Sequence, residues 1–238
     1  MGNKLGHKVL LTTILLTTAL ILLSSCMTMT PGSENFEFEY DYTLQLVKDQ
    51  TQEQAVTEMF MALTSYRHTL IPNEYAFLET ESPSIPGMGR LIQSWSTQVA
   101  DFLLSNFNYL TNLSNEVLDT IEFENPQQMV ETSDSSIAEL YRQLYFSTIE
   151  KAIHERLHEL NLGNWNAMVT QYNAWVATQE LLGNGSGKPI SESDIASKVS
   201  NLVADLYFTY FTQKETLIRT TPNPDMDPTA ARVLGLDR

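Results

Sequence analysis

The sequence predicts an all-α protein, a single irregular bundle of about six or seven helices that follows a lipoprotein signal and an extended tether. Apolar residues recur at three- and four-residue steps through most of the chain beyond residue 50, which is the spacing of amphipathic helices. Residues that begin or end helices separate these runs, and no later segment offers a partner strand. Amphipathic helices without strands bury their apolar faces against one another as a bundle.

Residues 1–25 are expected to form a cleaved signal peptide. Lys4 and Lys8 give a basic head, and residues 9–23 form an almost unbroken run of apolar residues and threonine. Because a bilayer core of about 30 Å needs about 20 apolar residues, this run is too short for a transmembrane helix. It closes with the lipobox Leu23-Ser24-Ser25-Cys26, whose small residues permit cleavage before the cysteine. Cys26, the only cysteine, is therefore the expected lipidation site.

The lipid anchor predicts where the protein resides. Each methylene of an acyl chain such as palmitate contributes about 0.8 kcal/mol when it is buried in the bilayer. Two or more such chains hold a protein stably on a membrane. We therefore expect a protein of the cell envelope that contacts the membrane through its acyl anchor. Met27 follows the cysteine, so the acidic residue that retains some lipoproteins in the inner membrane is missing. In a host with two membranes this predicts the outer membrane, facing the periplasm.

The composition of the mature chain excludes some partners. Cleavage after residue 25 leaves 213 residues, enough for one domain, with 12 basic and 29 acidic side chains and a net charge of −17. No nucleic acid is expected as a partner, because its phosphates require Lys and Arg. Anionic lipid headgroups would also repel the chain. With its one thiol acylated, the chain has no disulfide available, and no cofactor is expected.

Residues 26–42 are predicted to be an acylated tether to a helical domain at residues 43–238. Residues 36–42 alternate aromatic with acidic side chains, which is a strand signal. Without a partner strand, we expect an extended segment that lays its aromatic rings on the helical surface. The alternative is a short segment that adds a strand to another protein.

The first half of the domain is expected to hold three helices. Thr51-Gln52-Glu53-Gln54 resembles a capping box and opens a helix that Pro72 ends. Residues 73–89, rich in proline, are expected to be a loop. A long helix over residues 91–121 follows, and Asn125-Pro126 begins a short one.

The second half of the domain is also expected to consist of helices separated by loops. Ser133 is expected to cap a helix over residues 134–161, which Gly163 ends, and an amphipathic run covers residues 165–176. Residues 183–187 are a glycine-rich loop. Ser191 with Asp194 opens the last long helix, and Asp227-Pro228 begins a terminal helix followed by Gly235.

One segment matches a catalytic motif. His154-Glu155-Arg156-Leu157-His158 satisfies H-E-x-x-H, which on a helix presents two imidazoles to zinc with a glutamate as general base, and Glu180 is the candidate third ligand. At about 100° per residue, however, both histidines lie opposite the apolar stripe of their helix. Charges at Arg156 and Glu159 also favour solvation. We expect solvated histidines and no metal site, and retain a zinc-dependent hydrolase or peptidase as an alternative.

Glu215 and Arg219 form a second polar pair of interest. They are four residues apart with the acid first, the favoured order for an ion pair on a helix. Arg219 near the helix end also complements the helix dipole. We interpret the pair as a structural ion pair rather than a ligand site.

Three segments carry a resemblance to a known family. Residues 134–142 combine acidic and small residues with Tyr141-Arg142 at the start of a long helix, residues 121–125 precede a short helix, and the C-terminal segment runs from Glu215 to Gly235. In these features, over about residues 43–236, the chain resembles small bacterial helical lipoproteins classed only as a domain of unknown function (DUF4197-like). It departs at residues 95–101, where the family tends to an Asn- and Ala-rich helix. The resemblance implies a helical domain and no particular activity.

These observations predict a membrane-anchored extracytoplasmic lipoprotein whose role is binding or envelope-structural, with an envelope protein as a possible partner. The alternatives are the zinc-dependent hydrolase and a carrier of an apolar ligand. An enzyme should bring polar groups together in one cleft, whereas a carrier should enclose an apolar cavity. An interaction protein should expose an aromatic patch.

Overall fold

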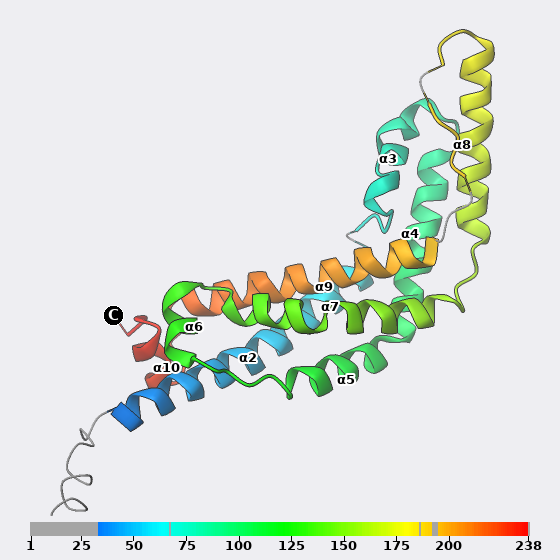
Figure 1. Ribbon diagram of the computed structural model, residues 1–238. Coiled ribbons are helices and arrows are strands. Elements are labelled where there is room, and N and C mark those ends of the chain that lie inside the picture. The colour runs from blue at the N-terminus through cyan, green and yellow to red at the C-terminus, as the bar shows by residue number, and fades with distance from the viewer. Residues whose placement is uncertain (1–32, 67, 186, 192–194, 238) are drawn as a thin grey trace, which may run out of the picture.

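The computed structural model describes residues 33–66, 68–185, 187–191 and 195–237, and in this part of the chain it is all-α with no strand (Figure 1). The helices are, in chain order, α2 (Ser33–Thr64), η1 (Asn73–Tyr75), α3 (Phe77–Glu81), η2 (Ser82–Ser84), α4 (Met88–Ser105), α5 (Phe107–Leu118), α6 (Pro126–Thr132), α7 (Ser136–Leu157), α8 (Gly163–Leu181), α9 (Ile195–Thr220) and α10 (Pro228–Val233). The predicted fold class is confirmed.

The helices form an elongated body and an arm (Figure 1). In the body, α9 packs along both α2 and α7, α5 packs on α7, and α6 and α10 pack on α2. The arm consists of α4 and α8 with α3 beside them, and it rises from the end of the body where α7 ends. One continuous apolar core joins the two parts, from Leu44 and Val47 in α2 to Trp95 in α4 and Trp165 in α8.

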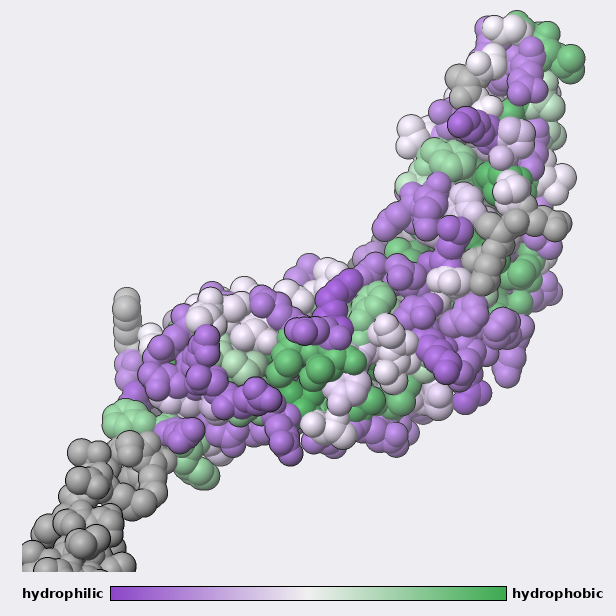
Figure 2. All heavy atoms as spheres, in the orientation of Figure 1, coloured by the Kyte–Doolittle hydropathy of each residue, from purple (hydrophilic) through white to green (hydrophobic). Residues whose placement is uncertain are grey.

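The surface is mostly polar on the face shown in Figure 2, in keeping with the acidic composition. Apolar side chains gather there over the middle of the body, where α7 passes. Leu144 on α7 is 52 % exposed. Exposed apolar side chains also lie at the start of α2 (Phe36, Phe38), in its last turns (Phe60, Met61) and after α8 (Leu182).

The extended conformation expected for residues 33–42 is wrong, because these residues form the first turns of α2. Contacts with the C-terminal helix stabilise the helical conformation: Arg232 Nη2 lies 2.8 Å from Glu39 Oε1, and Tyr42 donates to Asp227. Tertiary packing thus overrides the period-two pattern. Residues 26–32 lie outside the described residues. The capping box at residues 51–54 is also wrong, since Thr51 lies buried in the middle of α2.

The helix predicted for residues 91–121 is two helices, α4 and α5, separated at Asn106. The Asn106 side chain donates to the carbonyl of Phe102 at 3.0 Å, beside the backbone N–H of the same residue, and so competes with continuation of the helix. The loop predicted for residues 73–89 contains α3 and the two short 3-10 helices. These additional elements explain why the described residues form nine α-helices rather than six or seven.

Two predicted helix starts are confirmed. Asn125 accepts from Gln128 N at 3.2 Å at the start of α6, and Asp227 accepts from Thr229 N and Ala230 N at 2.9 and 3.2 Å at the start of α10. Gly235, with φ of 69°, follows α10 in the left-handed conformation that glycine favours. By contrast, α7 ends at Leu157 rather than 161, and Asp194 lies outside the described residues.

Candidate functional site

Cys26 and the signal segment lie outside the described residues, so lipidation stays a prediction. Among the helices that the structure describes, none has both the length and the apolar character needed to cross a bilayer.

The two histidines of the H-E-x-x-H segment lie at the end of α7. Their ring centroids are 4.7 Å apart, His154 is partly exposed, and His158 is exposed. Glu155 faces Lys151, whose Nζ is 3.9 Å from its Oε1. Glu180 is near the far end of α8, about 26 Å along the helix axis from Gly163, and Figure 1 shows α8 leading away from α7. In the described part of the chain, no three His, Cys, Asp or Glu side chains are grouped so that they could hold a metal ion.

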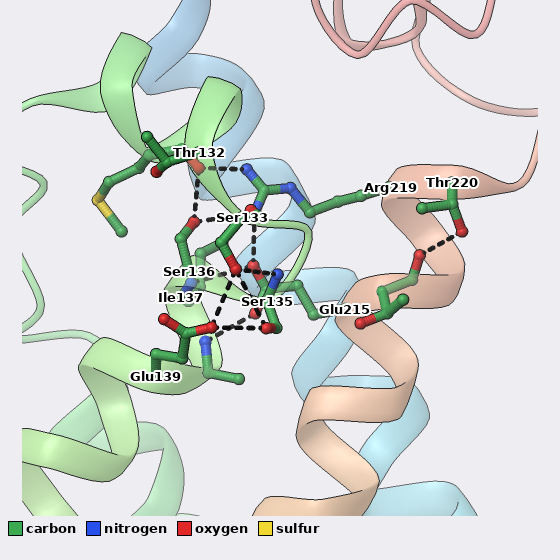
Figure 3. A network of polar contacts seen from close by, with 12 residues as sticks. Thr132, Ser133, Ser135, Ser136, Ile137, Glu139, Glu215, Arg219 and Thr220 are labelled. Carbon is green, nitrogen blue, oxygen red and sulfur yellow. Dashed lines mark hydrogen bonds and ion pairs between the residues drawn. The ribbon is translucent and has the colours of Figure 1, made fainter.

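Glu215 and Arg219 form a buried network that joins three helices (Figure 3). Arg219 Nη1 lies 2.9 Å from Glu215 Oε1, and the two residues are 3 % and 0 % exposed. The Glu215 carboxylate accepts from the backbone N–H groups of Ile137 and Ala138, at 3.0 and 2.7 Å. It therefore supplies two hydrogen-bond acceptors to the first turn of α7, where the helix dipole favours negative charge.

This arrangement corrects the cap predicted at Ser133. The Ser133 side chain instead accepts from Ser135 N and donates to Glu139, and its backbone carbonyl accepts from Arg219 Nη1 at 2.6 Å. Arg219 also donates to the Ser136 hydroxyl and to the Met129 carbonyl, both within 2.9 Å. Arg219 thus fixes the connection between α6 and α7 to the end of α9.

Burial raises the pKa of Glu215 to about 7, although the backbone N–H groups of Ile137 and Ala138 and the charge of Arg219 act in the opposite direction. Burial likewise lowers the pKa of Arg219, which the charge of Glu215 opposes. The pair bonds to the backbone of three successive segments: Glu215 to the first turn of α7, and Arg219 to carbonyls of α6 and of the connection between α6 and α7. The network is therefore a structural element of the body.

A second buried polar cluster lies in the middle of the body, where four helices meet. It consists of Gln52 from α2, Ser114 from α5, Tyr141 from α7 and Tyr207 from α9, each less than 9 % exposed. Tyr207 donates to Gln52 Oε1 at 2.6 Å, and Gln52 Nε2 donates to Ser114 Oγ at 3.0 Å. Ser114 Oγ also contacts the hydroxyls of both tyrosines.

Each hydroxyl in this cluster has one proton, which fixes the donor and the acceptor of every hydrogen bond. The one proton of Tyr207 goes to Gln52, so the Ser114 hydroxyl donates to Tyr207 and accepts from Tyr141 and Gln52. Burial raises the pKa of Tyr207 and of Tyr141, which keeps both hydroxyls protonated. Ser114, Tyr207 and Gln52 thus form a closed ring of hydrogen bonds. We call these three residues, together with Tyr141, the hydroxyl ring.

An apolar cavity lies directly against the hydroxyl ring. Ser114 and Tyr207 form one wall, and apolar side chains from α2, α4, α5 and α7 form the others, among them Val56, Met59, Leu103, Leu110, Ile149 and Ile153. The cavity is small, with a volume of about 30 Å³. Phe107, at the mouth, stacks edge-to-face on Phe60, which is 44 % exposed.

The mouth continues into a surface groove between α2 and α5. Val56 and Thr111 line both spaces, and the groove has a volume of about 530 Å³. Gln52 and Leu118 form its floor, while its rim carries Asp49, Glu53 and Asp119. We call this groove and the cavity that opens into it the α2–α5 groove.

Comparison of the chain with protein-family models, with curated proteins and with solved structures found no match. The resemblance to the lipoprotein family therefore stays a prediction.

Proposed function

We infer that the chain is a membrane-anchored extracytoplasmic lipoprotein that acts by binding a partner in the cell envelope, and that the α2–α5 groove is its binding surface. The observation that supports this inference is the apolar cavity at one end of the groove. Binding sites are typically concave and mostly apolar, with a few polar groups that fix orientation. The α2–α5 groove has these features, with Thr111 and Asn115 at the boundary between apolar and polar walls.

The chemistry around the cavity favours binding over catalysis. The hydrogen-bond partners of Ser114 Oγ are an amide and two phenols, Gln52, Tyr141 and Tyr207. A nucleophilic serine requires an adjacent general base, and none of these three groups accepts a proton at neutral pH. The hydrolase alternative has no third zinc ligand among the described residues.

The start of the body supports the envelope setting. Seven positions separate Cys26 from Ser33, the first residue of α2. Even a fully extended chain spans only about 25 Å over that distance. An acylated Cys26 would therefore hold the body close to the membrane surface.

Lipidation is tested by labelling with palmitate in a bacterial host. We expect the label to enter the wild-type protein, and Cys26→Ala to remove the label and leave an unprocessed precursor. Label that survives this substitution would contradict the lipoprotein assignment.

Binding at the groove is tested by photo-cross-linking in native membranes. Thr57, an exposed residue of the groove, is replaced by a photo-cross-linking amino acid, and Thr178 on the arm is the matched control position. We expect a specific product from position 57 and none from position 178. Thr111→Phe, which fills the junction of cavity and groove, should abolish the product. Absence of any product at position 57 would contradict the proposed function.

The cavity also favours a second candidate, a carrier of an apolar ligand. In that case the product at position 57 would be a small molecule that organic solvent extracts from the uncross-linked protein. The mass of the product therefore separates the two candidates.

A further inference from the structure

We propose that the partner of the α2–α5 groove is a basic amphipathic helix of another protein, which places an apolar side chain in the cavity and Lys or Arg side chains on the acidic rim. This inference rests on the proposed function, since it names the class of partner that the same groove accepts.

The shape of the groove suits a helix. The wall formed by α5 is 12 residues long, or about 18 Å, which corresponds to three turns of a partner helix. At one end the cavity offers a small apolar recess of about 30 Å³, lined by Met59, Leu103 and Ile153 among others. Helices that bind in grooves insert apolar side chains at three- and four-residue spacing, and a central apolar anchor dominates such interfaces. The cavity provides the place for that anchor.

The negative charge of the groove favours a positively charged partner. Asp49 and Glu53 extend from α2 on one side, and Asp119 follows α5 on the other. None of the described residues that line the groove is Lys or Arg. The sequence of α5 contains no basic residue, and that of α2 contains only Lys48, whose Nζ lies 3.9 Å from Asp49 Oδ1 and offsets part of the charge of that acid. Glu53 and Asp119 carry the rest of the negative charge of the rim. Complementary charge speeds association and rejects partners of the wrong sign.

The same charge argues against two other occupants. A second copy of this chain would bring further negative charge to the groove, because the mature chain carries −17. An acidic lipid headgroup would be repelled for the same reason. A basic helix satisfies both the apolar cavity and the acidic rim.

The test uses a synthetic peptide as the probe and the full lipoprotein in nanodiscs of zwitterionic phosphatidylcholine. The probe is a fluorescein-labelled helical peptide of leucine, lysine and alanine, with leucines at three- and four-residue spacing. The control peptide has glutamate in place of each lysine. Binding is measured by fluorescence anisotropy against empty nanodiscs. We expect the lysine peptide to bind at least tenfold more tightly than the glutamate peptide.

Two sets of variants locate the binding. Asp49→Asn, Glu53→Gln and Asp119→Asn together should weaken lysine-peptide binding at least tenfold and reduce its salt dependence. Thr111→Phe, or Val56→Phe if the first variant folds poorly, should weaken it to a similar extent by filling the cavity mouth. The matched control removes three exposed acids elsewhere, through Glu122→Gln, Glu124→Gln and Glu131→Gln, and should change binding less than twofold.

Several outcomes would overturn the proposal. Equal weakening by the two acid-to-amide sets would show attraction to overall charge rather than docking in the groove. Equal binding of the two peptides would show that the rim does not select a basic partner. If either result accompanied a persistent cross-link at position 57, the groove would bind a different class of partner, and the proposed function would stand. Loss of the cross-link would refute the proposed function itself.

Discussion

The two buried polar clusters of the body differ in charge and in what surrounds them. Glu215 and Arg219 are ionised or ionisable, and lie where α6 and α9 end and α7 begins, against the backbone N–H groups of the α7 N-terminus. The hydroxyl ring is neutral and lies at the centre of the body, against an apolar cavity. Helix ends offer free backbone groups that compensate a buried charge, whereas a cavity wall offers none. The charged cluster therefore fixes the ends of three helices in the body, while the neutral one forms a wall of the proposed binding surface.

The largest expected loss of stability comes from removing one partner of the buried ion pair. Arg219→Met leaves the Glu215 carboxylate buried without its cation, which should cost about 3–5 kcal/mol of unfolding free energy. Urea denaturation of the purified protein measures this loss. The control is Arg142→Met, which breaks the pair with Asp205 on the surface, where the two side chains are 46 % and 38 % exposed. That variant should lose about 1 kcal/mol or less. Similar losses in the two variants would contradict the assigned role of Arg219.

The charged cluster should also make stability depend on pH. The pKa of Glu215 is about 7 in the folded protein and near 4.5 when unfolded, so the folded state retains the proton between these values. The stabilisation that protonated Glu215 provides is complete below pH 4.5 and is lost as pH rises through 7. The free energy of unfolding should fall by an amount on the order of 3 kcal/mol over this range. The charged groups facing it are Arg219 and Glu139, with Asp134 beside Arg219.

Chemical denaturation at pH 5 and pH 8 measures this dependence. Glu215→Gln should be less stable at both values, because its amide cannot accept from both N–H groups, and should lose most of the difference between them. Tyr207→Phe, which alters only the hydroxyl ring, should retain the difference. If the wild-type protein is more stable at pH 8 than at pH 5, the hydrogen-bond donors around Glu215 lower its pKa by more than burial raises it.

A smaller effect is expected from the neutral cluster. Tyr207→Phe removes the donor to Gln52 and the acceptor of Ser114, so that two buried polar atoms lose a partner. This should cost about 1–3 kcal/mol in urea denaturation. Tyr141→Phe removes only a donor to Ser114 and should cost less. Equal effects of the two substitutions would mean that the ring is not closed as described.

The smallest effect is expected at the histidines of α7, which unlike both clusters are partly or fully exposed. Chelator should leave the melting temperature unchanged, because His154 and His158 have no third ligand nearby among the described residues. Purified protein should carry no stoichiometric zinc, and Glu155→Gln should have the stability of the wild type. One tight zinc ion per chain, measured by elemental analysis, would make the peptidase the leading hypothesis.

Sequence reasoning succeeded where the interaction is local. The caps at Asn125 and Asp227 involve residues two or three apart, and Glu215 and Arg219 are neighbours on one helix turn. It failed where the interaction depends on residues far apart in the sequence. The cap of α7 comes from Glu215, 77 positions from Ala138, so local reasoning could offer only a neighbouring residue such as Ser133.

The hydroxyl ring was missed for the same reason. Gln52 and Tyr207 are 155 positions apart, and nothing local joins them. One signal was present in the sequence: Ser114 falls within the apolar stripe formed by Leu110, Leu113 and Val117, where a polar side chain needs a buried partner. The identity of that partner depends on how four helices pack, which the helical period does not specify.

The closed ring of hydrogen bonds determines how the neighbouring cavity is hydrated. A buried water needs two to four polar partners, and the donors of Ser114 and Tyr207 are already used within the ring. The other walls are apolar, so the cavity should be dry. A side chain that enters it displaces no ordered water. Its insertion should therefore be driven by enthalpy at room temperature and accompanied by a negative change in heat capacity.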